Sequence, residues 1–280
     1  MSLHLPPLLS NRLAVLVSPH GGRGGLLGHG EQVAATTATA PLRSVDGLPR
    51  SGELGILFVS VVGSRAYGLH TDTSDVDYRG CFVAGSDIQF GLDGPPAQLV
   101  HDGDQLCLWE IEKLIRLALA ANPTVLEAFY SPQLVWQNSA IKADFERLRG
   151  AGTFLSRRVV DTFLGYSDAQ FKKMQRSRER GTRFKWQHAM HMIRLLQSGL
   201  RLIETGRFDV VVRAAERGDL LAIRAGEVAW ESVDQLRRVL SQKFRDAVNT
   251  SPLPLEPDRA AAESFLIGLR QRIAQRPFHD

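Results

Sequence analysis

No apolar run in this sequence is long enough to cross a membrane. The longest runs, residues 55–63 and 114–121, are less than half of the roughly 20 residues that a spanning helix needs. The N-terminus also lacks a basic segment followed by a long apolar core, so the sequence predicts no secretory signal. We therefore expect a cytoplasmic protein with no membrane partner.

Cysteine is almost absent. The two cysteines, Cys81 and Cys107, stand singly in apolar surroundings and lack the spacing of a zinc site. We expect buried free thiols of a reducing compartment, which excludes a disulfide-stabilised scaffold. With 44% hydrophobic residues among 280, the chain instead has enough apolar side chains for one large core or two small ones.

Charge is unevenly distributed along the chain. Residues 1–150 contain 11 Lys and Arg against 15 Asp and Glu, a net charge of −4, whereas residues 151–280 contain 23 against 15, a net charge of +8. An acidic half joined to a basic half favours carboxylates for a metal in the first and cations for phosphates in the second. Ordinary surface charge is the alternative.

The chain is predicted to have three parts. Residues 1–50 are rich in Gly, Ala and Thr, lack periodicity, and contain neither a P-loop nor a dinucleotide fingerprint, so a flexible extension is expected. Residues 51–150 are predicted to form a small unit of strands (54–62, 75–84, 104–111) and helices (112–122, 124–130, 141–150). Residues 151–280 have helical patterns at about 159–178, 185–205, 211–224, 231–248 and 259–275.

The stretch GSRAYGLHTDTSDVDYRG, residues 63–80, contains the clearest functional signal. Glycine after a buried strand permits close backbone approach to a ligand, and a helix beginning at Ser64 would present free N–H groups to an anion. In a strand, Asp75 and Asp77 point to one face, where two carboxylates repel each other unless a cation lies between them. Magnesium prefers such oxygen ligands. A Gly-Ser pair alone would also suit a simple capped turn.

This stretch resembles the nucleotidyltransferase motif of the DNA polymerase beta superfamily. Together with GILF before it and with WEIEKLIRLALAANPTVLE and HAMHMIRLL after it, the chain is similar over residues 54–235 to a bacterial and phage family of predicted nucleotidyltransferases. Some members accompany RNA ligases in RNA-repair operons. The resemblance implies an α+β fold, in which a polymerase-beta-type core with a short mixed sheet and helices on one side precedes a helical domain.

The resemblance also implies roles for individual residues. Gly63 and Ser64 would hold the triphosphate of an NTP. Asp75 and Asp77 would bind two Mg²⁺ or Mn²⁺ ions, one on the triphosphate and one at the attacking hydroxyl. Further candidates for phosphate contacts are Arg65 and Arg79, for which surface ion pairs are the alternative.

The family pattern includes a third acid on a neighbouring strand, and this chain departs from it. The corresponding position, five residues before Glu110, is Gln105. We predict that the adjacent Asp104 completes the catalytic and metal-binding set, although a one-residue offset turns a strand side chain to the other face unless a bulge intervenes. Glu110 shares the face of Asp104 in an unbroken strand but lies far along it. Without a third acid, slow transfer or nucleotide binding alone is expected.

Residues 171–201 contain nine Lys and Arg against one acid, Glu179. Such an excess favours contact with nucleic acid or polyphosphate over a solvated helix face, where the signs usually alternate. Phe171, Phe184 and Trp186 would stack on bases or pack in the core. The predicted nucleic-acid contacts are Lys172, Lys173, Arg176, Arg183 and Lys185.

In HAMHMIRLL, the residues His188, His191 and Arg194 are spaced three apart, so they share one helix face. No third ligand accompanies the histidines, which argues against zinc. The resemblance implies that this face closes over the nucleotide, and ordinary helix histidines are the alternative. DLLAIRAGE (219–227) also matches the family, and we predict only a packing role for it.

We therefore predict an enzyme that moves a nucleoside monophosphate from an NTP to a hydroxyl, in a cleft between the two units. An RNA end is the favoured acceptor. Two alternatives remain: a protein side chain as the acceptor, as in small antitoxin nucleotidyltransferases, and a nucleotide- or RNA-binding module without catalysis.

Overall fold

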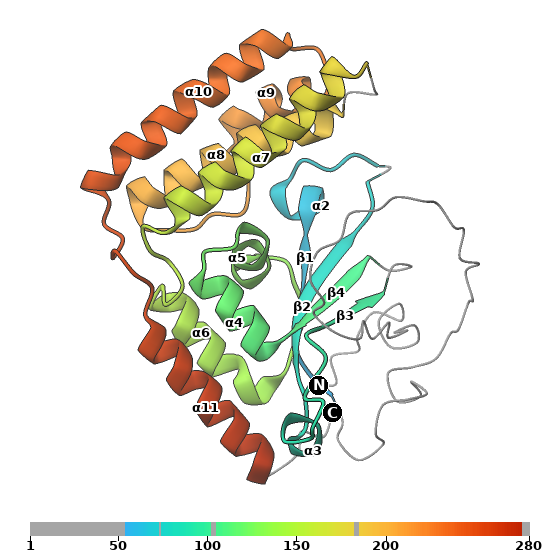
Figure 1. The fold of residues 1–280 in the computed structure, drawn as a ribbon, viewed down its shortest axis with the longest axis vertical. Coiled ribbons are helices and arrows are strands. Elements are labelled where there is room, and N and C mark those ends of the chain that lie inside the picture. The colour runs from blue at the N-terminus through green and yellow to red at the C-terminus, as the bar shows by residue number, and fades with distance from the viewer. Residues whose placement is uncertain (1–53, 73, 102–104, 182–184, 276–280) are drawn as a thin grey trace, which may run out of the picture.

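The computed structural model describes residues 54–275 except 73, 102–104 and 182–184. The predicted extension over residues 1–50 lies outside this range. A small sheet with helices against one face lies below a bundle of long helices (Figure 1). The α+β class predicted from the sequence is confirmed by this arrangement.

The sheet has the strand order β3-β4-β2-β1-β5 and is mixed. Only the pairing of β2 with β4 is parallel among these neighbours. β3 and β5 are four residues long and were not predicted. The strands are β1 (Gly55–Val62), β2 (Asp77–Val83), β3 (Gln98–His101), β4 (Leu106–Glu110) and β5 (Leu134–Gln137).

The two faces of the sheet are both apolar. Leu57 and Val62 of β1 face the main core, whereas Val59 packs with Phe82 and Leu108 on the other face. Burial of the central strands on both sides explains why β1 is a continuous apolar run without polar alternation. The sheet is therefore fixed around β1 and β2, the two strands that carry the motif.

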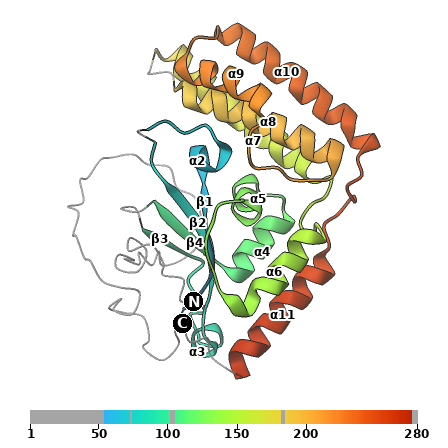
Figure 2. The ribbon, with the colours of Figure 1, turned by 180° about the vertical axis from the view of Figure 1, so that it is seen from behind.

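Three helices cover one face of the sheet: α4 (Ile111–Leu119), α5 (Pro123–Tyr130) and α6 (Lys142–Gly150), as Figures 1 and 2 show. Their contact with the sheet is aromatic. The ring of Phe129 on α5 lies 6.2 Å from that of Phe58 on β1, and Phe145 on α6 lies 5.4 Å from Phe58, both edge to face. Such pairs favour a fixed packing geometry.

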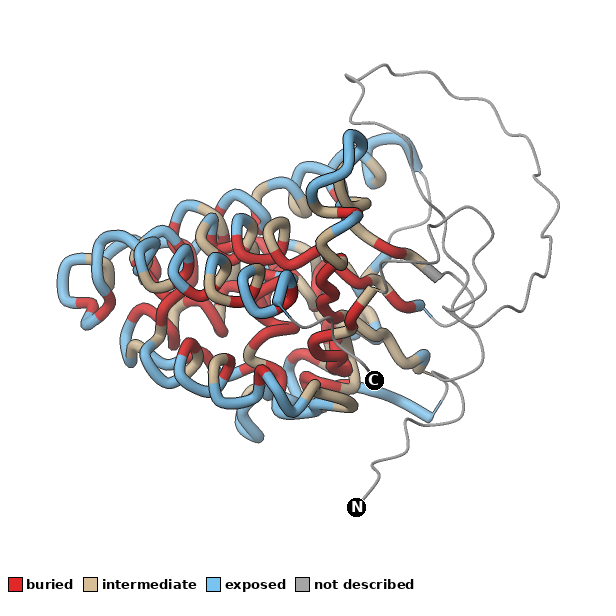
Figure 3. The backbone as a smooth tube through the Cα atoms, turned by 90° about the horizontal axis from the view of Figure 1, so that it is seen from below, coloured by how far each residue is buried: buried red, intermediate tan, exposed pale blue. Residues whose placement is uncertain are grey.

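The helical unit surrounds α8. This helix is buried along most of its length, and the buried parts of the chain gather in the interior (Figure 3). Its neighbours include α7 and α10, whose Phe163 and Phe244 pack edge to face at 6.4 Å. The helices after residue 150 are α7 (Val159–Glu179), α8 (Trp186–Thr205), α9 (Ala214–Ala225), α10 (Trp230–Asp246), η4 (Ala247–Thr250) and α11 (Arg259–Gln275). The short helices of the first unit are α2 (Gly63–Tyr67), α3 (Ser86–Gln89) and η3 (Ser139–Ile141).

The last helix, α11, returns to the first unit. Phe265 packs on Phe145 of α6 at 5.5 Å, and Arg270 forms an ion pair with Glu112 of α4 at 2.7 Å. The sequence grouped α11 with the helical residues 151–280, whereas its packing partners belong to the α/β unit. No helix in the described ranges has the length and apolarity needed to cross a membrane.

Candidate active site

The motif lies at the end of the sheet that faces the helical unit (Figure 1). β1 ends at Val62, which pairs with Asp77, the first residue of β2. At Gly63 the chain turns into α2 with a φ of 71°, a conformation that glycine adopts without strain. A Cβ on Gly63 would lie 2.5 Å from Oδ2 of Asp77, so only glycine leaves this carboxylate in place. The structure thus brings Gly63 and Asp77 together.

Ser64 follows in the first turn of α2 and is half-buried. The alternative of a simple turn capped by Ser64 is not found, because the helix begins one residue earlier and has Val62 at its N-cap, without a side-chain capping bond. Its hydroxyl has no hydrogen-bond partner among the described residues. A role of Ser64 in holding phosphate remains a prediction.

Asp75 was expected inside the strand beside Asp77, and this expectation was wrong. β2 begins only at Asp77, and Asp75 is an exposed residue of the segment before it. The reason is the ladder itself: β1 turns away after Val62, so nothing extends the β1–β2 pairing beyond Asp77. Asp75 therefore approaches Asp77 from a loop and is not held by strand alternation.

Gln105 immediately precedes β4. The parallel ladder of β2 and β4 begins with the pair Tyr78 and Leu106, so Asp77 and Gln105 each lie one residue before its first pair. Gln105 has a φ of 48°, outside the extended range, and its carbonyl accepts from the N–H of Tyr78 at 3.1 Å. Strand alternation consequently stops at this residue. Asp104, the predicted third acid, lies outside the described residues.

Glu110 does not join this site. It pairs with Phe82, five residues beyond Asp77, which is roughly 16 Å along a strand. Its carboxylate instead caps α4 by accepting from the N–H of Glu112, and it faces Arg270 at 4.0 Å. Within the described part of the chain, no three His, Cys, Asp or Glu residues are grouped closely enough to hold a metal ion.

The two arginines of the motif stabilise the chain around the aspartates. Arg65 donates from Nη2 to the carbonyl of Ser74 at 2.8 Å, and so fixes the loop that leads to Asp75. Arg79 donates from Nη1 to the carbonyls of Tyr78 and Gln105, both at 2.8 Å. Their predicted phosphate contacts are not tested by these bonds, since each guanidinium has further N–H groups.

Two arginines of α9 also hold the motif loop, and sequence reasoning missed both. Arg217 donates to the carbonyl of Gly68 at 2.9 Å, and Arg224 donates to that of Leu69 at 2.7 Å. Arg224 belongs to DLLAIRAGE, for which only packing was predicted. The match of DLLAIRAGE to the family was the signal that could have indicated Arg224. A motif far from the active-site residues in sequence can form the surface that positions those residues.

His188 and His191 lie on the side of α8 that faces the motif. The ring of His191 packs edge to face on Tyr67 of α2, 6.1 Å between centroids. Burial, together with the nearby charges of Arg194, His188 and Arg224, lowers the pKa of His191 to about 3. Burial also lowers the pKa of His188, to which Lys173 and Lys185 contribute. Both imidazoles are therefore neutral at pH 7.

Arg194 is not on an open face, contrary to the prediction. Its side chain is 6% exposed, and it donates from Nη2 to Oε1 of Glu127 on α5 at 2.6 Å. Its guanidinium also lies over the ring of Tyr67, 3.6 Å from the centroid. The physical reason is the environment of α8, whose residues from Ala189 onward are nearly all buried. We name Tyr67, Glu127 and Arg194 the buried cluster.

The basic face of α7 was predicted to contact nucleic acid. Lys172, Lys173 and Arg176 on α7, and Lys185 before α8, are all exposed, whereas Arg183 lies outside the described residues, as does Phe184. Phe171 is engaged within the protein: it stacks on Trp230 at 5.5 Å and has Arg237 over its ring at 4.0 Å. Base stacking by Phe171 is therefore not supported.

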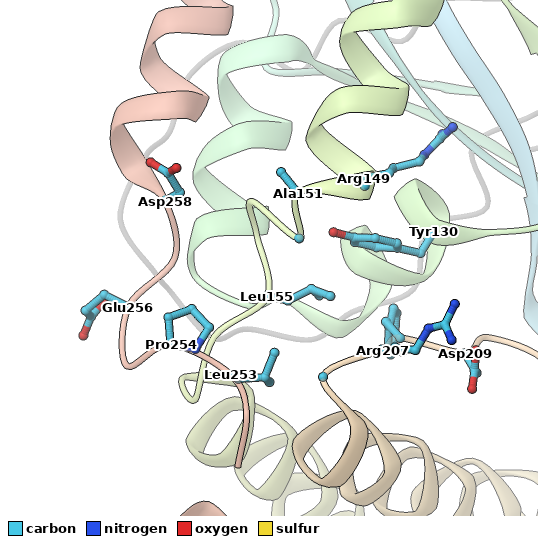
Figure 4. Close-up of a pocket in the computed structure, with 14 residues that line it drawn as sticks. Tyr130, Arg149, Ala151, Leu155, Arg207, Asp209, Leu253, Pro254, Glu256 and Asp258 are labelled. Atoms are coloured by element: carbon cyan, nitrogen blue, oxygen red, sulfur yellow. The ribbon is translucent and has the colours of Figure 1, made fainter.

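A separate cleft of about 720 Å³ opens between the two units (Figure 4). Tyr130 and Arg149 line it from α5 and α6, Arg207 and Asp209 from the segment after α8, and Leu253 from the segment before α11. None of the predicted site residues lines this cleft. The strand end that carries Asp77 is thus a distinct place in the fold.

The mixed sheet presents a Gly-Ser turn against the carboxylate of Asp77. The family follows from the sequence comparison: residues 40–268 match the model of RlaP, the RNA repair pathway DNA polymerase beta family, and the chain belongs to this family. It is accordingly a nucleotidyltransferase.

No curated protein matches the chain. Among solved structures, it is similar to a nucleotidyltransferase-like protein from Exiguobacterium sibiricum 255-15, with 12% identity and a TM-score of 0.29 over 78% of this chain and 74% of that one. Because this structural similarity is so low, the classification rests on the family match alone.

Proposed function

We propose that the protein transfers a nucleoside monophosphate from an NTP to a hydroxyl at an RNA end, with two Mg²⁺ or Mn²⁺ ions. A bond forms between the acceptor oxygen and the α-phosphorus, and the bond between the α-phosphorus and the oxygen that bridges the α- and β-phosphates breaks. Pyrophosphate leaves, and the proton of the hydroxyl passes to solvent. Positioning and charge neutralisation account for most of the rate in such reactions.

The residues present fit a divalent cation. Asp75 and Asp77 offer hard carboxylate oxygens, and phosphates of the NTP would complete the set, as is usual for magnesium. The Gly63 turn has no Cβ, so the Asp77 carboxylate has room beside the backbone. When bound, the ions neutralise the triphosphate and activate the attacking hydroxyl.

The chain's own residues bind and orient the nucleotide. In this proposal Gly63 and Ser64 contact the triphosphate, and Asp77 is held in place by its pairing with Val62. The loop before Asp75 is fixed at both ends, by Arg65 at Ser74 and by the α9 arginines at Gly68 and Leu69. These cations, together with Lys173 and Lys185 near His188, provide a positive field for polyphosphate.

One observation carries the proposal: the contact between the Gly63 turn and the Asp77 carboxylate at the end of a buried strand pair. A strand-to-helix turn with only a structural role does not require, against its glycine, a carboxylate that has no ion-pair partner among the described residues. The choice of RNA as the acceptor rests on the RNA-repair family and on the exposed cations of α7.

The test incubates the purified protein with each labelled NTP, Mg²⁺ or Mn²⁺, and a pool of RNAs with free 3′-hydroxyls. We expect label on RNA from the wild type and a loss of at least about 1,000-fold in the Asp75→Ala/Asp77→Ala variant, because metal binding is removed. Asp72→Ala is the matched control: it removes an exposed carboxylate from the same loop and should keep full activity. If label appears on protein instead of RNA, the acceptor is a protein side chain and not an RNA end.

Gln105 favours a second candidate, a nucleotide-binding module without turnover. Gln105 stands one residue before β4, at the position where the family pattern has its third acid, and an amide is no ligand of choice for Mg²⁺. This candidate predicts Mg²⁺-dependent NTP binding without transfer, and gain of transfer in Gln105→Asp. If the wild type transfers label and Gln105→Asp adds nothing, the module is excluded.

A further inference from the structure

The buried cluster joins three segments that are far apart in sequence. Tyr67 is the last residue of α2, and its hydroxyl donates to Oε2 of Glu127 on α5. Arg194 of α8 binds the other carboxylate oxygen, and its guanidinium lies over the Tyr67 ring. One carboxylate thus connects the motif turn, the α/β core and the central helix of the helical unit.

The cluster has no access to a ligand. Tyr67 is 5% exposed, and the side chains of Glu127 and Arg194 are each 6% exposed. Among the described residues, two donors of Arg194, Nε and Nη1, have no hydrogen-bond partner, which is a costly state for a buried guanidinium. An ion pair of this kind is a poor source of stability, because desolvation cancels most of its attraction. Its value must come from what it positions.

What it positions is α2. This helix has five residues and no side-chain cap, so it is too short to be stable by itself. Its first residue is Gly63, which lies against Asp77, and its last is Tyr67. A second connection is the N–H of Val212, which donates to the carbonyl of Tyr67 at 3.1 Å. α2 is therefore held at its C-terminal end by groups from the helical unit and from α5.

We propose that Tyr67, Glu127 and Arg194 are positioning residues that fix α2, and with it Gly63 and Ser64, against Asp77. The proposal rests on the function proposed above and deepens it. The cluster touches neither nucleotide nor metal. It determines the alignment of the triphosphate turn with the carboxylates, so its loss should lower kcat and leave the affinity for NTP nearly unchanged.

Two variants separate positioning from folding. Tyr67→Phe removes the bond to Glu127 but keeps the ring under Arg194. Glu127→Met/Arg194→Met replaces the whole ion pair by apolar side chains of similar size, a change that buried pairs often tolerate without loss of stability. We expect kcat to fall about 10-fold in the first and about 100-fold in the second, with KM for NTP changing less than about 3-fold.

The matched control is a second ion pair of α8, in which the arginine is buried and the glutamate is partly exposed. Arg201 is 4% exposed and binds Glu216 of α9 at 2.6 Å, and it has no contact with α2 among the described interactions. Arg201→Met/Glu216→Met should keep kcat within about 3-fold of the wild type. Thermal unfolding of all variants shows which of them fold.

Hydrogen exchange gives a readout that does not depend on catalysis. In the two cluster variants the amides of residues 63–69 should exchange at least about 10-fold faster, while β1, β2 and α8 keep their protection. Unchanged exchange of residues 63–69, or an unchanged kcat in a folded Glu127→Met/Arg194→Met variant, overturns the proposal. A wild type that transfers nothing refutes the proposed function, and the exchange of residues 63–69 still decides whether the cluster fixes α2.

Discussion

The strand end at Asp77 and the buried cluster behind it contain similar residues in opposite environments. At the strand end, charged side chains are partly exposed, and their neighbours are near in sequence. In the buried cluster, the partners are 60 and 67 residues apart and almost fully enclosed. Tyr67 belongs to both, because it ends the motif helix and its pKa, raised mainly by burial, is raised further by the charges of Glu127 and Asp77.

Under the proposed function, the difference separates residues that contact the nucleotide or metal from residues that position those contacts. Asp77 has a carboxylate at a glycine turn with no cation bound to it among the described residues, which is typical of a ligand site. Arg194 has the charge and the motif position of a ligand contact, yet its charge is used inside the protein. A match to a family motif is therefore no evidence that a side chain reaches the substrate.

Substitution of Gly63 tests most directly whether its contact with the Asp77 carboxylate is needed for nucleotidyl transfer. In Gly63→Ala, the new Cβ lies 2.5 Å from Asp77 Oδ2, and alanine at a φ of 71° is strained. We expect nucleotidyl transfer to fall at least about 100-fold, since the carboxylate must move by the better part of an ångström. Steady-state kinetics with NTP and acceptor measure this loss.

Gly68→Ala is the control that isolates the carboxylate. Gly68 has nearly the same φ, 74°, but a Cβ there meets nothing within 4 Å. Both variants should lose about 1 kcal/mol of unfolding free energy from the left-handed backbone. Only Gly63→Ala should lose most of its activity. Equal losses of activity in the two would mean that backbone strain, and not Asp77, explains the effect.

The long elements were predictable from the sequence because their patterns are long. α7 and α8 begin and end within one residue of the predicted ranges, since periodicity over about 20 residues outweighs local ambiguity. β3 and β5, with four residues each, were too short for any pattern. α11 was predicted as a helix but assigned to the wrong unit, because nothing in its periodicity says which surface it covers.

The site was predictable only where sequence neighbours meet. Gly63 and Asp77 come together because a strand and its antiparallel partner end at the same level. The bond from Arg224 to Leu69 spans 155 residues, and no spacing in the sequence could indicate it. Asp75 was misplaced because the ladder ends at Asp77, two residues short of it, so strand alternation does not reach it.

The dependence of stability on pH tests whether His191 is buried as the residues of the buried cluster are. Its pKa is about 3 in the folded protein and 6.5 when unfolded, so between these values the unfolded chain binds more protons. Stability is then fully present above pH 6.5 and is lost as the pH falls toward 3. From pH 6.5 to pH 5 we expect His191 to contribute a decrease of about 1.5 kcal/mol in unfolding free energy.

Denaturant titrations of the wild type and His191→Phe at both pH values measure this decrease. The aromatic replacement keeps the edge-to-face contact with Tyr67 and cannot be protonated. Its stability should fall by about 1.5 kcal/mol less than that of the wild type over the same interval. His188→Phe, which removes the less buried histidine one turn earlier, should reduce the decrease by less than His191→Phe does. Parallel pH curves for wild type and His191→Phe would refute the burial assigned to His191.

The smallest expected effect concerns the exposed cations of α7, which lie outside both regions compared above. Lys172→Gln/Lys173→Gln removes two predicted phosphate contacts, so the plot of log affinity for single-stranded RNA against log salt should become shallower by roughly 1.4. Lys142→Gln/Lys243→Gln removes the same charge from exposed positions on α6 and α10 and serves as the control. If both pairs change the slope equally, RNA responds to net charge alone and α7 is not its binding face. If neither changes it, the acceptor is bound elsewhere, and the protein acceptor becomes the better hypothesis.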